Sequence, residues 1–182
     1  MKTNIRDRNN NAGANIAELV TLESTSTAAS TIIQQGVYVT QVEIVSGAIA
    51  VTNASIATGV KLFTFPKGVI RVLGGYIDLS YVADAAMTAN PEVGLGHVVA
   101  TGAQATLGAA GVTMESIYDG TAQGAFNGTT PVTSEKNFVS EVDVLDGSST
   151  AIPVFFNVAA AWGGIANVAY TGTVTLIWAI VN

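Results

Sequence analysis

The sequence of 182 residues contains no cysteine and a single histidine, His97. The absence of cysteine excludes disulfides, thiolate zinc sites and cysteine nucleophiles. Charged residues make up only 11% of the chain, against about 25% in a typical soluble domain. The 7 Lys and Arg residues face 13 Asp and Glu residues, which gives a formal net charge of −6. A nucleic-acid partner is therefore not expected, because such a partner requires a basic face.

Long uninterrupted hydrophobic runs are also missing, although 49% of the residues are hydrophobic. Residues 147–182 carry no charge, but Pro153, Asn157 and Gly163 interrupt this stretch. A membrane-spanning helix needs about 20 consecutive, mostly apolar residues. We therefore expect no membrane partner, and we attribute the missing charge to burial in a core or an interface. The high hydrophobicity also excludes a disordered chain.

What the sequence does contain, from Gly36 onward, is a repeated alternation of apolar and polar residues. Tyr38 and Val42 fall on one face of a predicted strand, and Gln41 and Glu43 fall on the other. Further rows of this kind are Val60 and Leu62; Ile77, Leu79 and Tyr81; Val93 and Leu95; Phe138, Val142 and Val144; Ile152, Val154, Phe156 and Val158; and Val174, Leu176, Trp178 and Ile180. Gly, Pro and Asn turn signals separate the rows. Residues 36–182 are predicted to form an all-β domain, an antiparallel β-sandwich or jelly roll, with helical turns only at Thr113–Asp119.

Residues 1–35 differ in composition from the rest and are predicted to form an extended N-terminal arm. They contain three of the seven basic residues, an asparagine run and one short apolar patch at 16–22. A basic tip on an acidic body can reach an acidic patch on a neighbouring copy or on another protein. The residues expected to make such contacts are Lys2, Arg6, Arg8, Ile16, Leu19 and Leu22.

Several predicted strands carry apolar side chains at consecutive positions, which indicates packing on both faces. The residues concerned are Phe63, Phe65, Ile70, Val72 and Ile177. A single domain of this size has few places to bury that surplus. The pattern therefore predicts contact with a neighbouring subunit, in a homotrimer or a homodimer.

Groups that could carry chemistry are few. His97 shares a predicted strand face with apolar residues and is interpreted as a core or interface residue. Glu141 and Asp143 could form the carboxylate pair of a glycoside hydrolase, but a solvated strand face explains them better. Asp143 and Asp146 match no calcium loop. The sequence predicts no enzyme, catalytic residue, cofactor or metal site. Trp162, in an Ala/Gly-rich loop, is a candidate contact residue for a sugar or for a protein interface.

The chain between about residues 58 and 181 resembles small virion structural proteins of tailed phages, notably marine and cyanobacterial ones. The resemblance rests on Leu62–Gly75, Val93–Gly96 with the following Ala/Thr/Gly stretch to Leu107, Met114–Tyr118, Ile152–Val158 and Asn167–Trp178. It implies a capsid decoration (cement) protein, built as a jelly roll or β-sandwich. Such a protein oligomerises on the outer surface of the virion and binds the major capsid protein. The N-terminal arm lies outside the resemblance.

Three alternatives to a decoration protein remain open at this point. The first is a carbohydrate- or host-receptor-binding module, such as a tail or fibre component, centred on Trp162. The second is another shell subunit or a tail-knob component. The third is a hydrolase that uses Glu141 and Asp143.

Overall fold

The computed structural model describes residues 21–22, 28–34, 37–51, 57–83, 92–110, 113–120, 132–138, 140, 144–159 and 166–181. In these ranges the regular elements are ten strands and one short 3-10 helix. They are β1 (Thr21–Leu22), β2 (Ala28–Gln34), β3 (Val37–Val51), β4 (Ala57–Thr64), β5 (Gly68–Ala83), β6 (Glu92–Gly96), η2 (Leu107–Ala110), β7 (Val132–Phe138), β8 (Leu145–Gly147), β9 (Pro153–Ala159) and β10 (Ala166–Val181). The predicted all-β class is confirmed.

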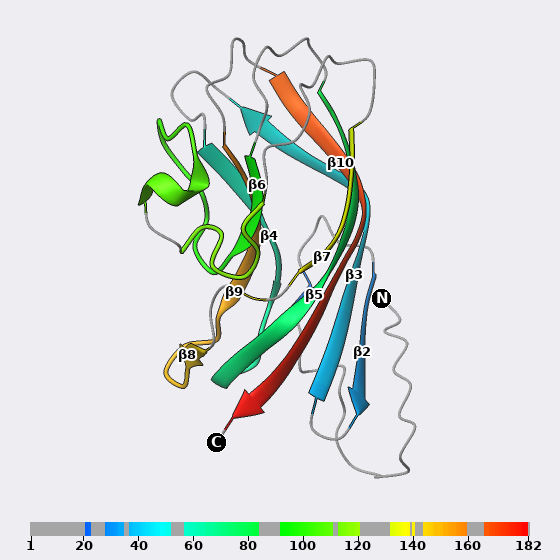
Figure 1. The fold of residues 1–182 in the computed structure, drawn as a ribbon, viewed down its shortest axis with the longest axis vertical. Coiled ribbons are helices and arrows are strands. Elements are labelled where there is room, and N and C mark those ends of the chain that lie inside the picture. Colours follow the sequence, from blue (N-terminus) through cyan, green and yellow to red (C-terminus); the bar gives the residue numbers. More distant parts are fainter. Residues whose placement is uncertain are drawn as a thin grey trace.

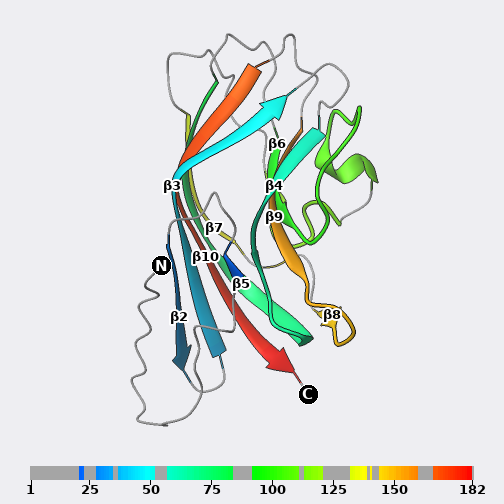
Figure 2. The same cartoon turned by 180° about the vertical axis from the view of Figure 1, so that it is seen from behind.

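The strands form two antiparallel sheets that face each other as a sandwich (Figure 1). The smaller sheet has the order β1-β4-β9-β6, and the larger has the order β2-β3-β10-β5-β7, with β8 also paired to β5. Strands β3, β5 and β10 are 15 or 16 residues long, whereas β4, β9 and β6 have 5 to 8. The larger sheet therefore extends beyond the smaller one, as the view from behind also shows (Figure 2).

The strand pairing is that of one long hairpin wound up on itself. β3 pairs with β10, β4 with β9 and β5 with β8, while β6 bridges to the chain at Tyr118 through Leu95. From β3 to β6, successive strands alternate between the two sheets. This nested order is that of a jelly roll, the finer form of the predicted sandwich.

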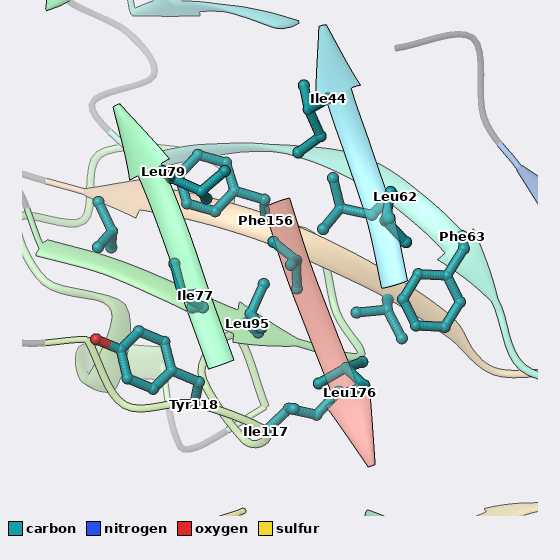
Figure 3. Packing of buried hydrophobic residues seen from close by; sticks show 14 of the residues in the cluster. Ile44, Leu62, Phe63, Ile77, Leu79, Leu95, Ile117, Tyr118, Phe156 and Leu176 are labelled. Atoms are coloured by element: carbon teal, nitrogen blue, oxygen red, sulfur yellow. The ribbon is translucent and has the colours of Figure 1, made fainter. Parts of the chain in front are cut away.

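The core lies between the sheets and is built from the residues that period-two alternation assigns to one face of each strand. Leu79 of β5, Phe156 of β9 and Leu176 of β10 meet there (Figure 3), and each is fully buried. Trp178, from the apolar row of the last predicted strand, is also fully buried. Its indole stacks on Tyr38 with ring centroids 4.4 Å apart, and its Nε1–H donates a hydrogen bond of 2.9 Å to Oγ1 of Thr40.

The prediction of two-sided packing is wrong for four of the five apolar residues on which it rests. Phe63, Phe65, Ile70 and Val72 are all buried in the sandwich. The register of β4 against β9 shifts between Lys61 and Phe63, so that Leu62 and Phe63 are both buried despite being neighbours. A β-bulge places two residues of one strand opposite one residue of its partner, which breaks strict alternation. Only Ile177 of the five points outward, with 38% of its surface exposed.

The helical turns predicted at Thr113–Asp119 are also wrong, because this segment is a turn followed by bends and bridges to Leu95 of β6 at Tyr118. Tyr118 N–H donates to the carbonyl of Leu95, and Leu95 N–H donates to that of Tyr118. The approach depends on glycine: a Cβ on Gly96 would lie 2.3 Å from the backbone of Met114. The Gly94-Leu95-Gly96 sequence therefore makes room for a neighbouring segment.

Two pieces of the predicted arm are paired as strands. Leu22 of β1 lies opposite Phe63 of β4, and β2 runs antiparallel to β3 from Ala28 to Gln34. The first twenty residues lie outside the described ranges. The docking role of the arm and the domain boundary at residue 35 stay predictions.

Candidate functional site

The segments between β6 and Gly120 are clamped onto the smaller sheet by Asn157 of β9. This side chain is fully buried. Its Oδ1 accepts a hydrogen bond of 2.9 Å from Ala100 N–H, and its Nδ2 donates to the carbonyls of Val98 (3.0 Å) and Met114 (2.6 Å). Gly59, on the neighbouring strand, leaves room for the amide, since a Cβ there would lie 1.9 Å from Oδ1. We call Asn157 with these three backbone groups the Asn157 clamp.

Three carboxylates gather where this clamped segment covers the edge of β6. Glu92, Glu115 and Asp119 have carboxylate oxygens within 4.8 Å of one another. Glu92 accepts a hydrogen bond of 2.5 Å from the backbone N–H of Leu107, Glu115 is buried, and Asp119 is exposed. Oxygen ligands of this kind suit hard cations such as Ca²⁺. Acidic groups also gather without an ion, however, so the expectation that the chain holds no metal stays a prediction.

His97 lies at the end of β6, beside the same segment. Its Nδ1 is 2.8 Å from Oγ of Ser116, and the ring is half-buried. Burial lowers the pKa of His97 below its ordinary value of 6.5, because desolvation disfavours the charged imidazolium. In the described structure its side-chain contact is thus a link between two loop segments.

This lowered pKa predicts a loss of stability in acid. The unfolded chain takes up the His97 proton near its ordinary pKa, while the folded chain resists it. The contribution is fully present above the unfolded pKa and is lost as the pH falls through the folded pKa. Denaturant unfolding at pH 7.5 and pH 5 should show a larger drop in the wild type than in His97→Gln. Equal drops in the two proteins would contradict this role of the imidazole.

Most of the residues predicted to make contacts or carry chemistry cannot be placed. Lys2, Arg6, Arg8, Ile16, Leu19 and Trp162 lie outside the described ranges, as do Glu141 and Asp143. The backbone of Leu22 pairs in the smaller sheet. Asp146 is exposed, and its Oδ1 accepts hydrogen bonds from the hydroxyl and the backbone N–H of Ser148. Both hydrogen bonds lower the pKa of Asp146, and the bond from the Ser148 hydroxyl has the larger effect.

The larger sheet has an outer face, turned away from the smaller sheet, that is partly apolar. Leu73 of β5 is 39% exposed, Ile177 of β10 is 38% exposed and Val181 is 36% exposed. The register places Val39 of β3 beside Ile177, and Val69 of β5 beside Val181. We call the surface formed by the outward residues of β3, β10 and β5 the outer face. An exposed, contiguous apolar patch on a soluble domain is typical of an interaction surface.

The same outer face becomes polar toward the other end of the strands. One outward row across β3, β10 and β5 consists of Gln41, Thr175 and Tyr76. The next outward row, two residues further along each strand, consists of Glu43, Thr173 and Asp78. At the apolar end, the corresponding row contains Arg71. Sequence alternation predicts which residues of one strand point outward. It does not reveal which residues of different strands share a row, because bulges set that register.

Comparisons with known proteins add little. No protein-family model matches the chain, and no curated protein matches it. Among solved structures, one that is similar belongs to infectious bursal disease virus, Gx strain. The match has a TM-score of 0.22 and 13% identity, and it covers 78% of this chain but 38% of the viral one. A likeness this slight supports no argument about fold or function. Among the described residues, no helix has the length and hydropathy of a membrane span.

Proposed function

We propose that the chain is a non-enzymatic virion structural protein that decorates the capsid and stabilises it by bridging neighbouring shell subunits on the outer surface. The observation that carries the proposal is the outer face of the larger sheet, where Leu73, Ile177 and Val181 remain exposed. The resemblance of residues 58–181 to phage virion proteins gives the same direction. The major capsid protein is the expected partner.

A bridging protein needs contact area more than reactive groups, and the long sheet supplies it. Strands β3, β5 and β10, with 15 or 16 residues, are about 50 Å long, strands β2 and β7, with 7 residues, are about 23 Å long, and each strand is about 4.8 Å wide. The outward side of the whole larger sheet therefore offers on the order of 1,000 Å². A stable interface buries about 800 Å² on each partner. Many copies on one shell would add their separate affinities through avidity.

Rigidity is the second property that suits this role. Aromatic side chains from both sheets pack together in the core, so a force on one sheet is transmitted to the other through many contacts. Phe65 packs edge-on against Trp178 at 5.1 Å, and Tyr81 stacks on Phe156 at 5.7 Å. The second pair joins the two sheets, because Phe156 belongs to β9 while Tyr81 belongs to β5 of the larger sheet. A sandwich joined in this way resists shear between its layers.

The alternatives rest on residues that cannot be compared with the structure. The carbohydrate- or receptor-binding module depends on Trp162, and the hydrolase depends on Glu141 and Asp143. All three residues lie outside the described part of the chain, and no described feature favours either function. Another shell subunit would use the same outer face in a different place of the particle.

The proposal is tested by adding the purified protein to particles of its virus that were assembled without it. We expect saturable co-sedimentation with the particles and a higher temperature of particle disruption. Replacing Lys2, Arg6 and Arg8 together by alanine should weaken binding, most strongly at low salt, because surface charges are screened as salt increases. The exposed Lys67→Ala variant is the control and should bind as the wild type does. A wild-type protein that stays in the supernatant at micromolar concentration would refute the proposed role.

A further inference from the structure

The outer face carries opposite charges at two positions of the same strand. Arg71 and Asp78 both belong to β5. The register places Arg71 beside Ala179 of β10, and Asp78 beside Thr173 of β10. Both neighbours alternate with the buried Val174, Leu176 and Trp178, so the two charged residues point outward. Arg71 is exposed and Asp78 is half-buried.

Within one chain these two charges cannot meet. Because Leu73 is the extra residue of a bulge, they are six register steps apart along β10, which is about 20 Å. Asp78 has Glu43 in its own row on β3 and Glu135 opposite it on β7. The acidic row and Arg71 are therefore at two separate places on one surface.

A two-fold axis that lies in this surface and crosses the strands midway between the two residues brings them together. Such an axis reverses the strand direction and keeps each strand's lateral place. Arg71 of one copy then faces Asp78 of the other, and the reverse holds for the second pair. Each residue lies about 10 Å from the axis. A long arginine side chain can bridge the offset that a packing angle of about 30° produces.

The same operation matches the rest of the face. One row of this face contains Val39 and Ile177, and Leu73 joins it as the extra residue of the bulge next to Gly74. In the dimer, this row packs on the partner's row of Gln41, Thr175 and Tyr76. Leu73 thus faces a tyrosine ring, and Ile177 faces the methyl-bearing Thr175. No carboxylate faces a carboxylate among the described rows of β3, β10 and β5, since Glu43 lies over Val37.

We propose that the outer face is the contact between two copies of this chain, which form a two-fold symmetric dimer held by two reciprocal Arg71–Asp78 pairs. The inference rests on the proposed function in one respect, namely that the chain exists to join surfaces. It names the partner of the outer face as a second copy, so that the contacts with the shell are those expected of the arm residues Lys2, Arg6 and Arg8. About this axis, residues 37–43 of β3, 171–181 of β10, 68–81 of β5 and strand β2 overlap between the two copies. The overlap is on the order of 600 Å² per copy, which is the lower end of the range of a standard interface. An isologous contact of this kind closes after two subunits.

Charge reversal separates this dimer from other uses of the face. In Arg71→Asp two carboxylates would face each other twice, and in Asp78→Arg two guanidinium groups would do so. Each variant alone should weaken self-association about 10- to 100-fold. An equimolar mixture of the two variants should form a heterodimer, because all facing charges are again opposite. Lys67→Asp, which changes the net charge as Arg71→Asp does, should dimerise as the wild type does.

The measurement is sedimentation velocity of the full chain from about 1 to 100 µM, with thermal unfolding of each variant to show that it is folded. A wild type that dimerises, single variants whose dimer dissociation constants are about 10- to 100-fold higher, and a mixture that dimerises as tightly as the wild type support the proposal. A monomeric wild type, single variants with an unchanged dissociation constant, or a mixture that associates no better than either variant alone would each overturn it.

The particle-binding experiment distinguishes this failure from failure of the proposed function. A wild type that is monomeric but binds particles keeps the bridging role and assigns the outer face to another occupant, such as the shell. If the protein dimerises but does not bind particles, the dimer contact at the outer face is supported and the proposed decoration of the capsid is refuted.

Discussion

Replacing Trp178 by alanine is expected to lower the free energy of unfolding by about 3–5 kcal/mol, the usual cost of removing a large buried aromatic side chain. Trp178 is fully buried, and it contacts both Tyr38 and Phe65 through its ring faces and edges. The substitution leaves a cavity at the place where the two sheets meet and removes the donor to Thr40. Because a domain of this size has only about 5–15 kcal/mol of stability, the effect should be visible in any denaturant titration.

A second variant separates packing from hydrogen bonding at this position. Trp178→Phe keeps most of the ring volume but removes Nε1–H, so we expect a smaller loss than for alanine. Thr171→Ala, at an exposed position of the same strand, is the control and should change stability by less than about 0.5 kcal/mol. A Trp178→Ala protein as stable as this control would show that the sandwich core is not arranged as described.

Replacing Asn157 by leucine is expected to destabilise the segments from residue 97 to residue 120 by about 3 kcal/mol or more. Three backbone groups, the N–H of Ala100 and the carbonyls of Val98 and Met114, lose their side-chain partner. Each buried polar group left without a partner costs about 1–3 kcal/mol. Leucine has the same branched outline as asparagine and is only moderately larger, so the change acts mainly by removing hydrogen bonds.

The effect of Asn157→Leu should be local, and hydrogen exchange measures it directly. The amides of Ala100, Ile117 and Tyr118 should exchange faster, while those in the middle of β10 should keep their protection. Gly59→Ala should act in the same direction, because its Cβ would collide with the Asn157 amide. Thr106→Ala, at an exposed position in the same segment, is the matched control. Unchanged exchange at Ala100 in Asn157→Leu would contradict the Asn157 clamp.

Much of the fold can be predicted from the sequence because alternation has a direct physical cause. Val42 and Ile44 alternate with Gln41 and Glu43, and the structure buries the first pair and exposes the second. The apolar row of the last strand is confirmed in the same way. The strand order cannot be predicted from alternation alone, since it depends on which strands pair with each other. In this fold the pairing of β4 with β9 lies inside the pairing of β3 with β10.

Two kinds of feature escape prediction from the sequence. Bulges break the period-two pattern, so consecutive apolar residues such as Leu62 and Phe63 suggest two-sided packing although both are buried in the core. Long-range contacts also leave no local signal: His97 meets Ser116 nineteen residues away, and Asn157 meets Ala100 across 57 residues. The carboxylate cluster of Glu92, Glu115 and Asp119 exists only because the segment to Gly120 folds back along β6.

The sequence also predicts a surface that contacts a neighbouring subunit, and this stays a prediction. Four of the five residues behind that prediction are core residues, and Ile177 is the one that faces outward. Its outward neighbours, Leu73 and Val39, become visible only once the register of β3, β10 and β5 is known. The two halves of the outer face, one apolar with Arg71 and one acidic with Asp78, are likewise a property of the register.

The most direct test of the central claim is cryo-electron microscopy of purified virions that contain the chain. We expect density with the shape of this jelly roll on the outside of the shell, in contact with at least two neighbouring capsid subunits. Density for the sandwich elsewhere in the particle would contradict a decorating role.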